Sequence, residues 1–510
     1  MVRQRLARFC RASMRDHETG WRFTAVVAAL YLIFLIWMQA HHEMWRDEVH
    51  AWSLARIAHG FGDLVTGDRR YEGHPPLWFW YLRVWGWLFP EAWGLQVATV
   101  AAAVGAAVLL LRYAPFPRYL KVMLLVTYFF GYEYTVMCRN YVLGWFLLCL
   151  FCTLYHPLRP RPLILAAIVG LLSWTSVYGL LIAGALAGFL IFDCVRWRGQ
   201  LEPRRLVIAA GPRQVIAVVL VVAAFAFCAW SVEPFDPNPY VGSWNFSELG
   251  WPALVPGLNR VLDGMAPLRP FAVDFWGRVS ELWSKYPAPM PYCGAILLLA
   301  AVGVLYRSWR VTLFYVLAVL VMQVSQIARY WGSPRHWGHY FMALVVACWL
   351  LRTLMPRRRH TPSLVLLTVL CCFQFQGFLV ATLVDTREVF SGGRDAAAFI
   401  RKAGLQDLPL VAGPAIFQTP ATFLRRPFYC VENEEVEETI AFHTRRQAFS
   451  PEALLAKAIA VSRQHHGPVV VITWMGVLPQ APPGVRASLL ATTRPGIVEE
   501  QFRVYLLDAS

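Results

Sequence analysis

The most constraining feature of the sequence is a series of apolar runs, each about 16 to 23 residues long. A bilayer has a hydrocarbon core of about 30 Å, which a helix crosses in about 20 residues. The composition agrees with this reading, because 57% of the 510 residues are hydrophobic and only 15% are charged. Soluble domains carry about 25% charged residues. The sequence therefore predicts a polytopic α-helical membrane protein.

The net charge of +16 could suggest a nucleic-acid partner. Its distribution argues against one, because residues 385–510 hold 13 basic and 13 acidic residues and are neutral. The excess lies in short loops between the apolar runs, as the positive-inside rule requires. We therefore expect no nucleic-acid partner and a cytoplasmic N-terminus. About eleven spans then place the C-terminal domain outside, in the periplasm if the membrane is a bacterial inner membrane.

Residues 1–384 are expected to form the membrane domain, with long outer loops at 41–90 and 232–289. The segment Pro75–Pro90 is apolar, but it is short. If it crossed the membrane, five later arginine clusters would face outward, so we expect it to be an amphipathic helix at the outer interface. The expected spans are about 23–40, 91–111, 120–137, 141–155, two within 163–194, 214–231, 290–306, 311–328, 339–354 and 362–383.

Residues 385–510 change in character and are expected to form a small extracytoplasmic α/β domain. Short buried strands are expected at Leu408–Ala412 and Val469–Trp474, and helices at Gly393–Ala403 and Pro451–His465. The acidic segment Glu432–Glu438 is expected to be a solvated loop rather than a metal site. The domain contains no G-x-G-x-x-G nucleotide-binding fingerprint.

Two neighbouring carboxylates, Asp47 and Glu48, follow the first span in the sequence MWRDEVHAWSLARI. They begin a probable helix, so ordinary helix capping is the simpler explanation. The alternative is catalysis at the membrane surface, which the nearby segment GHPPLWFWYL favours. There, His74 comes just before a rigid Pro-Pro that starts a helix.

Two further groups of ionisable residues lie near the expected outer ends of spans. Glu133 and Arg139 occur in GYEYTVMCRNYVLGW, where they could form a mutual salt bridge or face a cavity. The segment RYWGSPRHWGHY is basic although it is expected outside. Interfacial snorkelling could explain it, but so could phosphate binding, to which arginine is suited. Its candidate residues are Arg329, Arg335, His336 and His339.

Together these features resemble the GT-C superfamily of polyprenyl-phosphate-dependent glycosyltransferases. The resemblance is closest to the branch with protein O-mannosyltransferases and lipid A aminoarabinose transferases. It rests on the RDE acidic pair, the HPPL segment, the E-x5-R-N-Y stretch, the split spans within 163–194 and the C-terminal domain. The RHWGHY segment departs from the mannosyltransferase patterns.

The resemblance implies an inverting transfer of a sugar from a polyprenyl-phosphate donor to an acceptor on the outer face. The acceptor could be a protein, a lipid or a glycan. Asp47 would be the acid nearest the acceptor, and Glu48 would orient it or bind the acceptor. His74, Arg139 and the Arg329–His339 segment would lie near the donor phosphate. Glu133 is an acceptor-binding or metal-binding candidate.

The chemistry fits these roles, because a sugar phosphate already has a good leaving group and needs no dedicated general acid, unlike a glycoside. One carboxylate must take a proton from the acceptor, and cations must stabilise the departing phosphate. A divalent metal ion bridging carboxylate and phosphate is compatible with this scheme, with Asp47, Glu133 and His74 as candidate ligands.

Two other classes of function remain open from the sequence. A transporter or flippase for a lipid-linked sugar would bind at the bilayer midplane, often between inverted repeats. The sequence shows no such repeat, and its unusual charges gather near the outer surface. A scaffold that presents the C-terminal domain is the third alternative.

Overall fold

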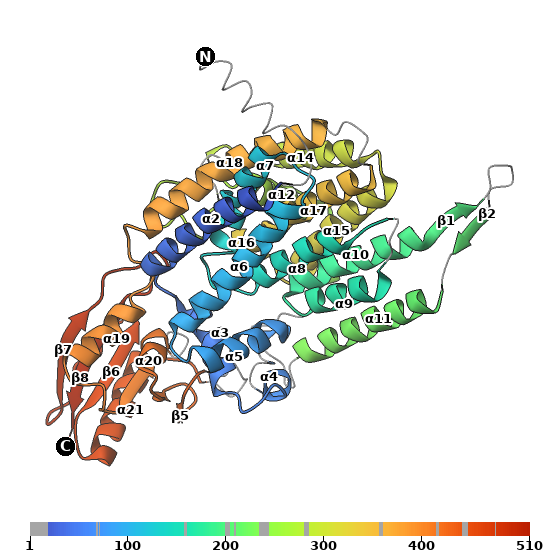
Figure 1. Ribbon diagram of the computed structural model, residues 1–510. Helices are drawn as coiled ribbons and strands as arrows, with labels where there is room; N and C mark the ends of the chain where they lie inside the picture. The colour runs from blue at the N-terminus through green and yellow to red at the C-terminus, as the bar shows by residue number, and fades with distance from the viewer. Residues whose placement is uncertain are drawn as a thin grey trace.

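The computed structural model of the protein shows a helical bundle with a smaller sheet-containing domain at one end (Figure 1). It describes residues 19–509 apart from 68, 69, 71, 158–160, 199–204, 209, 210, 234–243, 280–284, 356–360, 415–417, 441–446 and 475. Both the bundle and the sheet were expected from the sequence.

Six helices of the described chain are long and apolar enough to cross a membrane. Each coincides with an expected span, because unbroken apolar runs satisfy their backbone polar groups most simply as helices. They are α2 (Trp21–His41), α6 (Trp93–Tyr113), α11 (Pro212–Val232), α15 (Trp309–Ala328), α16 and α17 (Pro334–Trp337 and His339–Leu354) taken together, and α18 (Thr361–Asp385).

The other expected spans coincide with shorter apolar helices, so the total of eleven stays a prediction. The expected span at 120–137 is a short α-helix followed by one π-helical turn, which places Glu133 at the end of that turn. The helices that coincide with the other expected spans are α7 (Arg118–Leu125), η2 (Phe129–Glu133), α8 (Tyr141–Leu154), α9 (Pro162–Ser173), α10 (Val177–Cys194) and α14 (Met290–Leu305). The antiparallel strands β1 (Val195–Arg198) and β2 (Arg205–Ile208) follow α10.

The two segments expected to form long outer loops contain short helices in their described parts, and none of these is a candidate span. The segment after the Pro-Pro pair forms α5 (Leu77–Leu88), whose 12 residues extend only about 18 Å. Its Trp78 and Leu82 are buried, whereas Trp87 is exposed. The helix is thus too short to cross a bilayer, in line with the prediction for this segment. The other outer helices are α3 (Arg46–Ile57), α4 (Asp63–Thr66), η3 (Phe246–Glu248) and α12 (Trp251–Met265).

The C-terminal domain has a six-stranded mixed sheet in the order β5-β4-β3-β6-β8-β7. Strands β4 and β6 run parallel to β3, whereas the other pairs are antiparallel. Its elements are α19 (Gly393–Lys402), β3 (Leu410–Gly413), α20 (Thr419–Leu424), β4 (Phe428–Cys430), β5 (Glu435–Glu437), α21 (Pro451–His465), β6 (Val469–Trp474), β7 (Arg486–Thr492) and β8 (Phe502–Asp508).

The four elements expected in this domain are present, because their apolar periodicity was strong. The acidic segment was expected to be a loop throughout, and this was wrong for Glu435–Glu437. These residues pair with β4 as an edge strand, where backbone hydrogen bonds form although Glu435 and Val436 are exposed.

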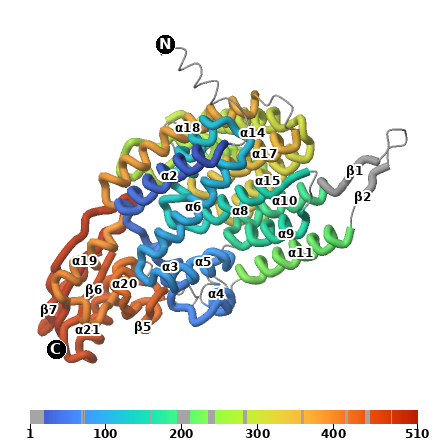
Figure 2. The backbone as a smooth tube through the Cα atoms, in the orientation of Figure 1, coloured from blue at the N-terminus to red at the C-terminus, as the bar shows by residue number. Residues whose placement is uncertain are grey.

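The C-terminal domain packs directly on the outer part of the bundle, beside α3 (Figure 2). The Arg394 guanidinium lies 2.8 Å from the Glu43 carboxylate. The Ser53 hydroxyl is 3.0 Å from that of Thr422, which belongs to α20. The backbone N–H of Arg46 donates to the buried Glu500 carboxylate at 3.1 Å. The domain therefore holds the beginning of α3 from outside the bundle.

Candidate active site

The two neighbouring carboxylates at the start of α3 have different surroundings. Glu48 is fully buried and accepts the backbone N–H of Trp45 at 2.9 Å, as the acidic residue of a capping box does. It also accepts the backbone N–H of Cys138, and it lies 3.2 Å from His42 Nε2. Asp47, one residue earlier, keeps 28% of its side chain exposed. Glu48 therefore anchors the helix, while Asp47 faces a cavity.

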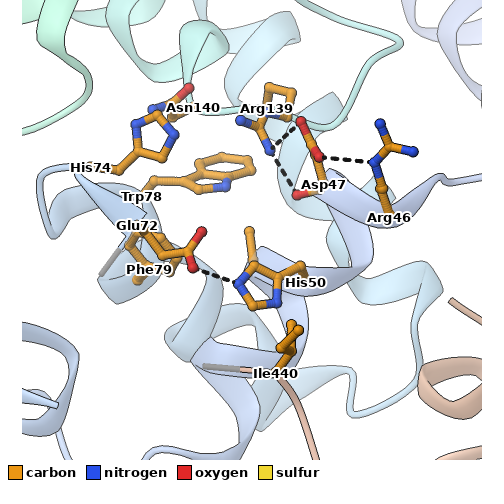
Figure 3. A pocket seen from close by; sticks show the side chains of 11 residues that line it. Arg46, Asp47, His50, Glu72, His74, Trp78, Phe79, Arg139, Asn140 and Ile440 are labelled. Carbon is orange, nitrogen blue, oxygen red and sulfur yellow. Dashed lines mark hydrogen bonds and ion pairs between the residues drawn. The ribbon is translucent and has the colours of Figure 1, made fainter. Parts of the chain in front are cut away.

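This cavity has a volume of about 130 Å³, is open to solvent, and lies between the bundle and the C-terminal domain (Figure 3). Asp47 and His74 were both expected to lie near substrate, and the structure brings them to the same cavity, together with Arg139. The complete lining is Arg46, Asp47, His50, Ala51, Glu72, His74, Trp78, Phe79, Arg139, Asn140 and Ile440.

Three arginines surround the Asp47 carboxylate. Its oxygens lie 3.8 Å from Arg139, 3.5 Å from Arg335 and 3.8 Å from Arg46. Burial by itself raises the pKa of Asp47, but the attraction of these guanidinium groups, Arg139 first, outweighs burial and lowers the pKa below its usual range. Asp47 is therefore ionised at neutral pH. Arg139 is fixed further by its 2.7 Å hydrogen bond to the backbone carbonyl of Asp47.

His74 lies on the cavity wall just before the helix α5. Burial, followed by the nearby Arg139 guanidinium, lowers the pKa of His74 to about 4. The imidazole is therefore neutral at pH 7. It can form hydrogen bonds with a bound phosphate without adding a positive charge.

Arg335 is held in place by aromatic rings. Its guanidinium carbon lies 5.4 Å from the ring centroid of Trp45 and 5.4 Å from that of Trp276, within cation–π distance of both. Its backbone carbonyl accepts the hydroxyl hydrogen of Tyr134 at 2.8 Å. Arg335 thus approaches Asp47 with a restricted side chain, as a phosphate-binding arginine requires.

The two histidines of the same segment lie in an aromatic cluster. His336 Nδ1 accepts the backbone N–H of Ser333 at 2.8 Å, and its ring stacks on Tyr178 at 5.2 Å. His339 Nδ1 lies 2.8 Å from the carbonyl of His336 and 3.2 Å from the Tyr134 hydroxyl. Both side chains are buried, and neither is among the residues lining the cavity. The Tyr134 hydroxyl links His339 to the backbone carbonyl of Arg335, to which it donates.

Glu133 is also buried, and its partners differ from the one considered from the sequence. Its Oε2 accepts hydrogen bonds from the Tyr128 hydroxyl at 2.7 Å and from Trp276 Nε1 at 3.1 Å. Arg139 pairs with Asp47 instead of Glu133. Glu133 therefore holds Trp276, one of the rings against Arg335, and it is not among the cavity-lining residues.

Arg329 lies apart from the cavity lining, with its guanidinium carbon 5.3 Å from the ring centroid of Trp244. No metal site is evident in the described part of the chain, where no group of three or more His, Cys, Asp or Glu side chains is close enough to hold an ion. The candidate ligands Asp47, Glu133 and His74 do not form such a group. The described residues therefore do not confirm the divalent ion considered from the sequence.

Several cavity residues were missed from the sequence. His50 follows Asp47 by three residues, so helical periodicity could have placed both on one face. Glu72 precedes His74 by two residues in a segment already considered, and Asn140 follows Arg139 directly. No sequence pattern indicated that Ile440 lines the cavity, because it lies in another domain.

Comparison with known proteins supports the fold. Neither a protein-family model nor a curated protein matches the sequence. Among solved structures, ArnT from Cupriavidus metallidurans in the apo state is similar with a TM-score of 0.54 and 14% identity, covering 95% of this chain and 97% of that chain. The same protein bound to undecaprenyl phosphate gives a TM-score of 0.49 and 13% identity over 96% and 98%. Arabinofuranosyltransferase AftD from Mycobacteria gives 0.39 and 12%, over 97% of this chain and 40% of that chain.

Only the first similarity is close enough to support a conclusion, and at this identity it concerns the fold. It extends over nearly the whole of both chains, so it includes the helical bundle together with the C-terminal domain. The chain therefore shares the fold of ArnT over nearly its whole length, in agreement with the helical membrane bundle and C-terminal domain predicted from the sequence.

Proposed function

We propose that the protein is a glycosyltransferase that moves a sugar from a polyprenyl-phosphate donor to an acceptor on the outer face of the membrane, with inversion at the anomeric carbon. One observation carries the proposal: the ionised Asp47 lines a solvent-open cavity and lies 3.8 Å from Arg139, which also lines it, and 3.5 Å from Arg335, which adjoins Asp47 outside the lining. A base and two phosphate-binding cations thus occupy one site. The similarity of the fold to ArnT supports the same reading.

The proposed reaction is a single displacement. As the acceptor oxygen attacks the anomeric carbon, its proton passes to the Asp47 carboxylate. The bond from that carbon to the phosphate oxygen breaks, and its electron pair remains on the phosphate. Arg139 and Arg335 stabilise the negative charge that develops there. Attack from the side opposite the leaving group inverts the configuration.

The arginines also connect donor binding to the strength of the base. Without donor, they lower the pKa of Asp47 and make it a weak base. A phosphate bound between Arg139 and Arg335 neutralises part of their charge, so the pKa of Asp47 rises towards its ordinary value. Asp47 then takes a proton more readily when the donor is in place. The neutral His74 contributes a hydrogen bond to the phosphate.

The membrane setting follows from the same site. The cavity lies where the bundle meets the C-terminal domain. The cavity and the C-terminal domain would therefore lie on the side of the membrane that holds the acceptor. With a cytoplasmic N-terminus in a bacterial inner membrane, that side is the periplasm. The lipid tail of the donor would remain in the bilayer, while its phosphate reaches Arg335. The acceptor is a protein, lipid or glycan with a nucleophilic hydroxyl or amine.

Replacement of Asp47 by asparagine tests the proposal in a deletion strain of the native host. A deletion strain that expresses the variant should accumulate lipid-linked sugars to the same level as the deletion strain itself, because loss of a general base lowers the rate about 10²- to 10⁴-fold. Asp63→Asn is a matched control, since Asp63 lies in the same loop and caps the exposed N–H groups of His59 and Gly60. It should restore turnover.

Binding of undecaprenyl phosphate to the purified proteins, used as a probe, separates catalysis from folding. Asp47→Asn should bind the probe at least as well as the wild-type protein, since a competing negative charge is removed. Near-normal sugar turnover by Asp47→Asn would show that Asp47 is not the base.

A further inference from the structure

The C-terminal domain contributes directly to the wall of the cavity. Ile440, which follows β5, lines the cavity beside His50 of α3 (Figure 3). Behind this wall, Gln418 and Thr439 of the same domain contact the His50 ring. Three residues of the C-terminal domain therefore converge on one histidine of the candidate active site.

The orientation of the Gln418 amide follows from its two contacts. Its Oε1 accepts the backbone N–H of Ile440 at 2.9 Å, so its Nε2 is the atom that lies 2.7 Å from His50 Nδ1. An amide NH₂ group can only donate, so His50 Nδ1 must accept. The Thr439 hydroxyl lies 3.2 Å from the same nitrogen and can donate to it as well.

This arrangement determines which ring nitrogen of His50 carries hydrogen. Because Nδ1 accepts, its lone pair is in use and the ring hydrogen lies on Nε2. His50 Nε2 lies 2.8 Å from Glu72 Oε1 and donates to it. Glu72 lines the cavity, and its side chain is 13% exposed. A backbone N–H of the C-terminal domain is thus linked through Gln418 and His50 to a carboxylate of the cavity wall.

We propose that Gln418 is a positioning residue of the active site: it fixes the tautomer of His50 and thereby holds Glu72 as a hydrogen-bond acceptor towards the cavity. This inference rests on the proposed function for its consequence, because a carboxylate held in this way selects a substrate group that donates hydrogen bonds, such as a sugar hydroxyl. The C-terminal domain then takes part in substrate selection.

Gln418 is suited to this role because it is 1% exposed and therefore makes its hydrogen bonds away from competing water. The Glu72 carboxylate keeps a hydrogen on Nε2 whatever the partner of Nδ1 is. Replacing the donor at Nδ1 by an acceptor should therefore add a hydrogen to Nδ1, so that both ring nitrogens are protonated.

The tautomer can be tested by ¹⁵N-histidine NMR of the full-length protein in lipid, with His50→Asn used to identify the His50 signals. In the wild-type protein, Nδ1 should have the shift of an unprotonated nitrogen. In Gln418→Glu, the side chain still accepts from Ile440 but can no longer donate, so Nδ1 should become protonated. Gln406→Glu, in the same domain with its amide nitrogen bonded to Asp407 and not to His50, should leave the His50 signals unchanged.

Sugar turnover in the deletion strain tests the consequence. Gln418→Met keeps the approximate size of the side chain and removes both hydrogen bonds, and it should lower turnover about tenfold. Its binding of undecaprenyl phosphate should match that of Gln406→Met, since Arg139 and Arg335 are unchanged.

The possible results separate the two proposals. A protonated Nδ1 in the wild-type protein, or unchanged His50 signals in Gln418→Glu, would overturn the positioning role whatever Asp47 does. Full turnover by Gln418→Met would overturn the effect on substrate selection. If Nδ1 becomes protonated in Gln418→Glu but Asp47→Asn remains active, the tautomer assignment stands and the proposed function fails.

Discussion

His42 offers a quantitative test of how the site is held together. It lies just past the end of α2, with Nε2 3.2 Å from Glu48 and Nδ1 3.0 Å from Asp385 at the end of α18. All three side chains are essentially inaccessible to solvent. Replacing His42 by glutamine would leave two buried carboxylates without the cation that lies between them.

The size of the effect follows from the electrostatics. Burial opposes a charge on His42, but Asp385 and Glu48 outweigh it and raise the pKa from 6.5 to about 10. This difference corresponds to about 5 kcal/mol of preferential interaction with the protonated ring. Breaking a buried ion pair costs about 3–5 kcal/mol, which is of the same order. We therefore expect His42→Gln to lower the free energy of unfolding by about 3–5 kcal/mol at neutral pH.

The dependence on pH has a definite sign. Because the folded-state pKa of His42 is raised above the unfolded value, its stabilisation is complete below about pH 6.5 and is lost as the pH rises through about 10. Thermal unfolding of the full chain in detergent at about pH 6, 8 and 10 measures this. His41→Gln is the matched control, since His41 is exposed and lies 2.8 Å from the carbonyl of Trp37.

Two results would refute this reasoning. One is a His42→Gln protein that unfolds at the same temperature as His41→Gln near neutral pH. The other is a loss of wild-type stability between about pH 6 and 10 that persists unchanged in His42→Gln, because the loss would then come from other groups.

Two further predictions concern the phosphate site and the packing of the bundle. Arg335→Gln should weaken binding of undecaprenyl phosphate about 10- to 100-fold, the contribution of a charge-assisted hydrogen bond. Arg329→Gln is the control, because Arg329 packs against Trp244 whereas Arg335 pairs with Asp47, and it should bind like the wild-type protein in the same titration. Gly338→Ala should lower the unfolding temperature, because the added methyl group would overlap the ring of Phe129 and overpacking costs about 1–3 kcal/mol. Gly303→Ala, where nothing lies within 4 Å of the added carbon, should leave the unfolding temperature unchanged or raise it.

The sequence predicted the parts of the fold that depend on local periodicity. The long apolar runs became helices, and the segment before Pro90 became the surface helix α5. Asp47 was predicted at a helix start, but the sequence could not show that it faces a cavity while Glu48 is buried. That difference depends on Cys138 and His42, which approach from other segments.

The remaining site residues could not be predicted, because they depend on contacts between distant parts of the chain. Gln418 lies 368 residues from His50 in the sequence, and no local pattern connects them. His336 and His339 were expected near the phosphate, because their composition suggested a cationic loop. The aromatic rings that enclose them come from α8 and α10, and these rings became apparent only in three dimensions.

The strand order of the C-terminal sheet has a consequence for biogenesis. Strand β8, residues 502–508, lies between β6 and β7, although it follows both in the chain. Until it has been synthesised, β6 lacks one neighbour and β7 has no partner within the sheet. The contact between Gln418 and His50 depends on this domain being folded. The helical bundle would therefore be made before the cavity wall is complete, and the site would become competent only once residues 502–508 had joined the sheet.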